Sequence, residues 1–145
     1  LLQTNLRFGK KTMTRTLILF RHAKADSAFP DDPPLSETGR RHHVLNVKNL
    51  KESGLKIDAL FSSPLRRAQE TAEILGDNFD LEVALLPELA EDDVAALVEL
   101  AEQLPEETTT VFVGHAPTLA ELGRRLSKTH DFVELAPGQM RIVSF

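Results

Sequence analysis

Three times along this chain, a short and largely apolar run ends in cationic or imidazole side chains and then leads into a helix. The three segments are TLILFRHAK (16–24), ALFSSPLRRAQET (59–71) and TTVFVGHAP (109–117). Apolar runs of this kind are typical of strands that are covered on both faces, as in a parallel sheet. Strands that alternate with helices therefore predict an α/β protein with helices on both sides of the sheet.

The same alternation continues over the rest of the chain and predicts a single-domain, three-layer α/β/α sandwich. The sheet is expected to be mostly parallel, with the tail GQMRIVSF (138–145) as an antiparallel edge strand. Capping residues and glycines set the expected helix ends, with Ser63-Pro64 read as the start of the second helix and Gly76 as its end. The expected strands are 16–20, 59–61, 82–86 and 110–113, and the expected helices are 36–53, 63–75, 92–103 and 117–126.

Composition narrows the class of protein. The 145 residues are 41% hydrophobic, which suits one compact core, and the net charge is -5. An acidic chain without a basic stripe or a membrane-length apolar stretch argues against nucleic-acid and membrane partners. There is no cysteine, which excludes disulfides and cysteine-based phosphatase chemistry and favours a cytoplasmic location.

The first residues differ from the rest of the chain. Residues 1–13, which end at Met13, are mildly basic and lack the apolar core of a secretory signal. We expect them to be an upstream extension or a cloning remnant, and residues 14–145 to form the functional domain.

Charged and imidazole side chains follow the predicted strands at the point where each strand ends. Arg21 and His22 follow the first predicted strand, Arg66 and Arg67 follow the second, and His115 follows the fourth. Because ligands bind at the carboxyl ends of the strands in an open parallel sheet, we expect these groups to converge in one crevice. Two imidazoles and one or two guanidinium groups form a local cationic site that suits a phosphoryl group.

Helical spacing separates the two adjacent arginines. Arg66 shares its stripe with Glu70, four residues later, and is expected to pair with it on the solvent side. Arg67 shares its stripe with Thr71 and Ile74, beside the apolar face, and lies in the first turn of the helix. Arg67 is therefore the arginine predicted for the site.

Four short motifs follow one another along the chain: R-H-A (21–23), P-L-S-x-x-G (34–39), S-P-L-x-R-A-x-x-T (63–71) and G-H-A-P (114–117). With these motifs in this order, the chain resembles the histidine phosphatase superfamily. The similarity covers roughly residues 16–145 and implies a phosphoglycerate mutase-like fold. The R-H-A-K opening and the small size resemble the SixA-type phosphohistidine phosphatases most. One departure is Pro33, which stands where SixA-type relatives often have an arginine.

The resemblance implies roles for individual residues. His22 would be the nucleophile that becomes phosphorylated, Arg21 and Arg67 would clamp the phosphoryl oxygens, and His115 would be the second imidazole on them. No cofactor or metal is implied. The implied partner is a protein phosphorylated on histidine, such as a phosphocarrier or phosphorelay domain. Only a few residues follow Leu86 before the next helix, so a helical lid is not expected and an open site would admit a protein side chain.

Further residues and alternatives remain open from the sequence. Glu88 is the best candidate for a general acid, needed if the leaving group is an alkoxide, and Lys24 would extend the cationic rim. The acidic run 91–93 is interpreted as helix-capping surface and not as a metal site. His42, His43 and His130 are expected on a polar helix or in a loop, without a function. The alternatives are a phosphatase for a small phosphomonoester and a non-catalytic reader of phosphoproteins.

Overall fold

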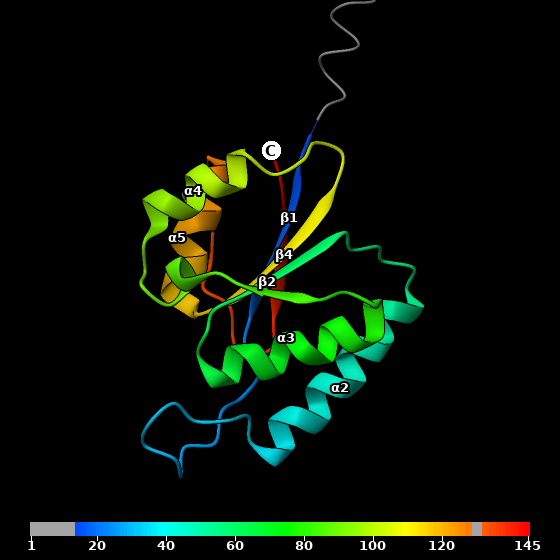
Figure 1. The fold of residues 1–145 in the computed structure, drawn as a ribbon, viewed down its shortest axis with the longest axis vertical. Coiled ribbons are helices and arrows are strands. Elements are labelled where there is room, and N and C mark those ends of the chain that lie inside the picture. Colours follow the sequence, from blue (N-terminus) through cyan, green and yellow to red (C-terminus); the bar gives the residue numbers. More distant parts are fainter. Residues whose placement is uncertain (1–13, 129–131) are drawn as a thin grey trace, which may run out of the picture.

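A computed structural model describes residues 14–128 and 132–145, so the expectations for residues 1–13 and for His130 lie outside the described residues. Its centre is a five-stranded sheet in the order β3-β2-β4-β1-β5 (Figure 1). β5 runs antiparallel to β1 at one edge, and every other pairing is parallel, which confirms the predicted α/β fold. The strands are β1 (Thr16–Arg21), β2 (Ala59–Ser62), β3 (Val83–Leu85), β4 (Thr109–Gly114) and β5 (Met140–Ser144).

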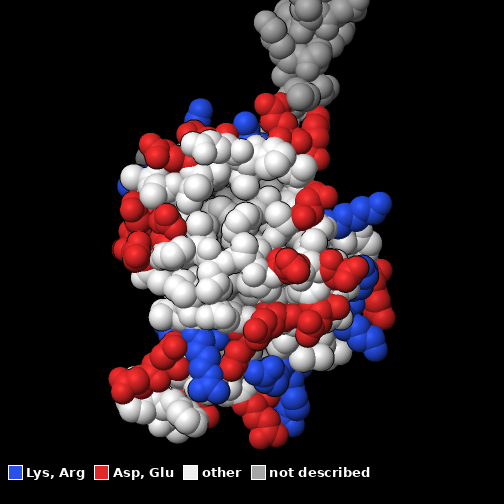
Figure 2. All heavy atoms as spheres, in the orientation of Figure 1, with Lys and Arg blue, Asp and Glu red and all other residues white. Residues whose placement is uncertain are grey.

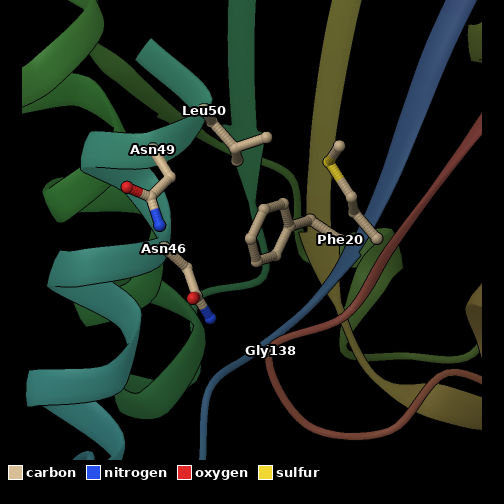
Figure 3. Close-up of a pocket in the computed structure, with 6 residues that line it drawn as sticks. Phe20, Asn46, Asn49, Leu50 and Gly138 are labelled. Carbon is tan, nitrogen blue, oxygen red and sulfur yellow. The ribbon is translucent and has the colours of Figure 1, made fainter. Parts of the chain in front are cut away.

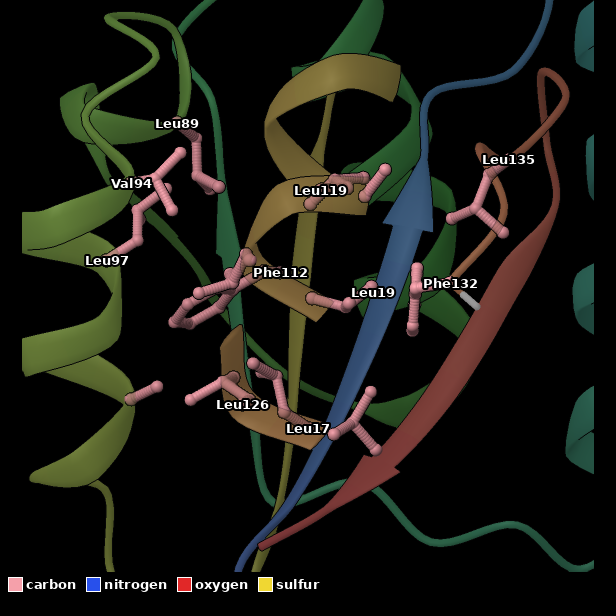
Figure 4. Close-up of a cluster of buried hydrophobic side chains, with 14 residues drawn as sticks. Leu17, Leu19, Leu89, Val94, Leu97, Phe112, Leu119, Leu126, Phe132 and Leu135 are labelled. Atoms are coloured by element: carbon pink, nitrogen blue, oxygen red, sulfur yellow. The ribbon is translucent and has the colours of Figure 1, made fainter. Parts of the chain in front are cut away.

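Helices cover both faces of this sheet, as Figure 1 shows. Side chains that alternate along β1 enter two separate cores, because successive residues of a strand point to opposite faces. Leu17 and Leu19 join the core under α4 and α5 (Figure 4), whereas Ile18 and Phe20 join the core under α2 and α3. The helical elements are α2 (Glu37–Glu52), α3 (Arg66–Phe79), the 3₁₀ turn η1 (Pro87–Leu89), α4 (Val94–Glu102) and α5 (Ala116–Ser127).

The register of the sheet brings three strand ends to one level. Arg21 pairs with Gly114 across β1 and β4, and Ser62 lies beside Val113 across β2 and β4. The residues that follow these three strands therefore begin at the same edge of the sheet. This edge is where the sequence places the candidate phosphate site.

The predicted bounds of the second helix were wrong. α3 begins at Arg66 instead of at Ser63-Pro64, and its N-cap residue, Leu65, makes no side-chain capping bond. The Ser63 hydroxyl lies instead between the Leu65 amide and His115, so it does not cap the helix. The helix also continues through Gly76 to Phe79, and its C-cap residue, Asp80, has a left-handed φ of 57°.

His43, predicted on a polar helix or in a loop, lies on α2, but its side chain is buried. Its side chain is 1% exposed and stacks edge-on against Phe20, with ring centroids 5.4 Å apart. His43, Gly39 and Val47 form the buried stripe of α2 at spacings of four residues. Gly39 also lets the helix approach the loop after β1, because a Cβ there would lie 2.4 Å from the Lys24 carbonyl oxygen.

Candidate active site

His22 lies directly after β1 in a setting that fixes its tautomer. Its Nδ1 is 2.7 Å from the Ala23 carbonyl oxygen, and the side chain is buried with 8% exposed. A carbonyl oxygen can only accept a hydrogen bond, so Nδ1 carries the proton. The ring therefore presents the unprotonated Nε2, whose lone pair is the atom that a nucleophilic imidazole uses.

Arg67 contacts this same nitrogen. Its Nε donates to His22 Nε2 at 3.3 Å from the first turn of α3. Arg66 lies on the other side of the helix, where its Nε is 3.2 Å from a Glu70 carboxylate oxygen. The structure thus brings Arg67 to the imidazole and leaves Arg66 in an exposed ion pair.

His115 reaches the site from the end of β4. Its ring centroid is 5.3 Å from that of His22, with 57° between the ring planes. Its Nε2 lies 2.9 Å from the hydroxyl oxygen of Ser63, which follows β2. Its Nδ1 is buried and has no hydrogen-bond partner among the described residues. Two imidazoles thus lie side by side at the carboxyl ends of adjacent strands.

Arg21 is the last residue of β1 and the fourth member of the group. Its Nη1 donates to the Leu135 carbonyl at 2.8 Å, which anchors one end of the guanidinium. Within the part of the chain that the structure describes, its Nε is buried and unpaired. The anchored guanidinium adds a second positive charge beside the two rings.

Burial and these charges keep both imidazoles neutral. Burial lowers the pKa of His22, and Arg67 and Arg21 lower it further, against the opposing effect of the Ala23 carbonyl. The pKa of His115 falls to about 4, first through burial and then through His22, Arg67 and Arg21. At neutral pH the site therefore combines two uncharged rings with two guanidinium cations.

Stability is expected to decrease as the pH falls from 7 to 5. Histidines in the unfolded chain gain a proton near pH 6.5, whereas His115 in the folded protein does so only near pH 4. Between these two pH values the unfolded state binds more protons than the folded state. The free energy of unfolding therefore decreases as the pH is lowered. Urea unfolding at pH 7, 6 and 5 measures this, above the range where most carboxylates titrate. A midpoint that stays constant over this range contradicts the prediction.

A network from α3 holds the loop after His22 in place. The Ala23 amide donates to Thr71 Oγ1 at 3.0 Å, and the same hydroxyl donates to the Arg67 carbonyl at 2.8 Å. Glu70 fastens the next part of the loop by accepting from the Leu35 amide at 2.8 Å. Neither Thr71 nor Ser63 was predicted at the site; Ser63 was predicted only as the start of the second helix. Their positions in the S-P-L-x-R-A-x-x-T motif were the available signal.

Glu88 and Lys24 stand apart from this group. Glu88 lies in η1, directly after β3, and its Oε1 is buried without a hydrogen-bond partner among the described residues. Lys24 is exposed and lines a small hollow of about 130 Å³ together with Gly39 and His42. No hydrogen bond among the described residues joins either side chain to the imidazoles, so their roles stay predictions.

A second hollow of about 300 Å³ adjoins this one, sharing Asn46 and Gly138 with it. Figure 3 shows Asn46 and Asn49 on the α2 wall and the Phe20 ring opposite, with Gly138 below. The Gly138 amide donates to the carbonyl oxygens of Arg21 and His22. The two hollows therefore border the loop that carries the candidate nucleophile.

The acidic residues near η1 have structural partners. Asp93 caps α4 by accepting from the Ala96 amide at 3.2 Å, as the sequence predicts for this run. Asp92 accepts from the Thr118 hydroxyl at 2.6 Å. Over residues 14–128 and 132–145, no three His, Cys, Asp or Glu side chains are grouped so that they could hold a metal ion.

The surface shows where the charges lie. On the face in Figure 2, acidic and basic side chains are mixed along the lower part of the molecule, and no continuous basic area is present. None of the described helices has the length and apolar character needed to cross a membrane.

Comparison with known proteins agrees with this geometry. The family profile of the histidine phosphatase superfamily (branch 1) matches residues 17–131, which include His22, Arg67 and His115. The chain belongs to this superfamily. Among the proteins similar to this chain, sequence relatives include mutases and solved structures include phosphatases.

The curated sequence relatives include phosphoglycerate mutases. The 2,3-bisphosphoglycerate-dependent phosphoglycerate mutase of Bartonella henselae is 39% identical over 88 residues, which cover 54% of this chain and 43% of the mutase. This chain thus spans less than half the length of that relative. An uncharacterized protein of Picosynechococcus sp. is 34% identical over 114 residues, covering 72% of this chain and 68% of that protein.

Solved structures of phosphohistidine phosphatases share the fold over most of their length. The structure of the protein histidine phosphatase SixA complexed with tungstate superposes with a TM-score of 0.74 and 23% identity, covering 88% of this chain and 86% of SixA. A candidate phosphohistidine phosphatase SixA from Nakamurella multipartitia gives 0.75 and 26% identity, covering 90% and 84%. A mycobacterial glucosyl-3-phosphoglycerate phosphatase gives 0.70 and 21%, covering 90% of each chain.

Proposed function

We propose that this protein is a metal-independent phosphatase that acts through a phosphohistidine formed on His22. The observation that carries the proposal is the setting of the His22 ring. Its Nδ1 proton is committed to the Ala23 carbonyl, and its Nε2 is held at the Arg67 guanidinium. A phosphoryl group that binds the guanidinium is thereby brought to the lone pair that attacks it.

The reaction has two displacements. In the first, the Nε2 lone pair attacks phosphorus, the bond from phosphorus to the leaving group breaks, and the leaving group departs with the bonding electrons. In the second, water attacks the phosphohistidine, the P–Nε2 bond breaks, and inorganic phosphate leaves with the oxygen of that water. The water gives up one proton, which balances the proton taken up by the departed leaving group, and Nε2 recovers its lone pair.

The cationic side chains stabilise the charge on the transferring group. Arg21 and Arg67 offer planar donor forks that match two phosphoryl oxygens at once. His115 donates a further hydrogen bond to the same oxygens. These groups supply the positive charge that the equatorial oxygens need in the transition state.

The substrate that we propose is phosphohistidine on a protein. Two facts support it: the SixA structures match over 84–86% of their own length, whereas this chain covers only 43% of the Bartonella mutase. A leaving imidazole needs less protonation than an alkoxide, so this substrate needs no dedicated general acid at the site.

The test is a screen of a histidine-phosphorylated protein beside a panel of sugar and acid phosphates, all with EDTA present. We expect release of inorganic phosphate from the phosphoprotein at an undiminished rate in the chelator. Loss of activity in EDTA contradicts a metal-independent mechanism. Turnover of small esters alone contradicts a phosphoprotein substrate.

A second candidate is a phosphatase for a small phosphomonoester, favoured by Glu88 and by the mutase relatives. The buried Oε1 of Glu88 has no partner in the described part of the chain, so it is free to exchange a proton with a leaving alkoxide. Under this alternative, Glu88→Gln lowers kcat for a phosphomonoester by about 10²- to 10⁴-fold. The exposed Glu91→Gln is the matched control. If Glu88→Gln leaves ester hydrolysis unchanged, the alternative is wrong.

A further inference from the structure

Ser63 occupies a position that neither its sequence motif nor the proposed reaction explains. It is fully buried, and its amide donates to the Val113 carbonyl at 2.9 Å, so its backbone is fixed by β4. Its hydroxyl oxygen lies 2.9 Å from His115 Nε2 and 3.2 Å from the Leu65 amide nitrogen. One hydroxyl thus joins the second imidazole to the start of the helix that carries Arg67.

One of the two contacts of this hydroxyl has a fixed direction. The Leu65 N–H can only donate, so the Ser63 oxygen accepts from it and keeps its own proton available. Pro64 has no N–H, which makes Leu65 the first residue after Ser63 able to make this contact. Toward His115 Nε2, 2.9 Å away, the hydroxyl can donate to an unprotonated nitrogen or accept from an N–H. A neutral ring whose Nε2 accepts carries its proton on Nδ1.

We propose that Ser63 is a positioning residue that holds His115 as the Nδ1–H tautomer in the ligand-free protein. Through the same hydroxyl, it keeps the ring in place when an anion binds. A hydroxyl donates to a neutral imidazole and accepts from a protonated one, so the contact survives a change in the charge of the ring. The lowered pKa of His115 agrees with a neutral ring in the free protein. The role of His115 toward the phosphoryl group rests on the proposed function, whereas its tautomer does not.

The neighbouring serine provides a matched control. Ser62 is equally buried, but its hydroxyl donates to the Ser63 carbonyl at 2.8 Å and makes no hydrogen bond to His115 in the described structure. Ser62→Ala and Ser63→Ala therefore remove the same atom from the same depth. Ser63→Thr keeps the hydroxyl and serves as the conservative variant.

The first measurement is nitrogen NMR of histidine-labelled, ligand-free protein at pH 7, with the His115 signals assigned from a His115→Gln spectrum. In the unchanged protein we expect His115 to carry its proton on Nδ1. In Ser63→Ala we expect a shift toward the Nε2–H form, while Ser62→Ala and Ser63→Thr keep the Nδ1–H form. A His115 ring protonated on Nε2 in the unchanged protein overturns the proposal even if Ser63→Ala fails to fold.

The second measurement is the dissociation constant of inorganic phosphate. We expect it to rise about 10-fold in Ser63→Ala, the loss of one hydrogen bond that orients a ligand group, and to stay unchanged in Ser62→Ala. Equal affinities in Ser63→Ala and the unchanged protein overturn the proposal. Neither measurement requires turnover. A protein that is inactive but shows the expected tautomer would therefore contradict the proposed function and still support the role of Ser63.

Discussion

Replacing His22 with alanine is expected to lower kcat by about 10⁴- to 10⁶-fold, because it removes the atom that forms the covalent intermediate. The change keeps the His22 backbone, whose amide donates to the Gly114 carbonyl at 3.0 Å, so the fold should persist. Initial rates with a phosphoprotein or a phosphate ester measure the loss. Thermal unfolding of the variant and of the unchanged protein shows whether activity is lost without a loss of the fold.

The same variant also tests the intermediate itself. Quenching the unchanged protein during turnover of a radiolabelled substrate should trap label on histidine, stable in alkali and released by acid. His22→Ala should trap none. Full turnover by the variant, or label that never attaches to histidine in the unchanged protein, would exclude His22 as the nucleophile.

Replacing Arg67 with alanine is expected to lower kcat/KM by about 10²- to 10³-fold, since one fixed donor to a developing anion contributes about 2.7–4 kcal/mol. It should also move the acid limb of the pH–rate profile. Arg67 holds the pKa of His22 down, so without it the ring is protonated at a higher pH and activity is lost at a higher pH. Rates measured between pH 5 and 8 report both effects.

The adjacent arginine is the control for this experiment. Arg66→Ala breaks only an exposed pair with Glu70, worth about 0.3–0.5 kcal/mol of stability, and should leave kcat/KM and the acid limb unchanged. Arg67→Lys keeps the charge but loses the planar fork, so it should restore the acid limb more than the rate. A loss in Arg66→Ala as large as that in Arg67→Ala would contradict the assignment.

Local periodicity made the choice between these two arginines predictable from the sequence. Glu70 lies one helical turn after Arg66, and Thr71 one turn after Arg67, so the phase of α3 alone separates the solvent side from the core side. The strands could also be predicted from the sequence, because their apolar runs and flanking turns are local signals. The structure confirms the fold, and the catalytic roles stay predictions.

His43 and Ser63 were misread because their surroundings come from distant parts of the chain. Three polar residues, 40–42, precede His43 in sequence, but α2 docks so that its ring meets Phe20 from β1 and the Thr71 carbonyl from α3. Ser63 stands before a proline, which is also the pattern of a helix start. Its actual partner, His115, is 52 residues away and reaches it only through the pairing of β2 with β4.

The order of the strands also bears on how the protein opens. The candidate catalytic groups follow β1, β2 and β4, and each of these has a paired neighbour on both sides, whereas β3 and β5 form the edges. Partial unfolding begins where the fewest contacts must break, so amide hydrogens of the two outer strands should exchange with solvent first. The imidazole and guanidinium groups of the site would then stay together while the edge strands β3 and β5 unfold locally. Turnover should accordingly persist in mild urea, up to the cooperative unfolding of the interior strands.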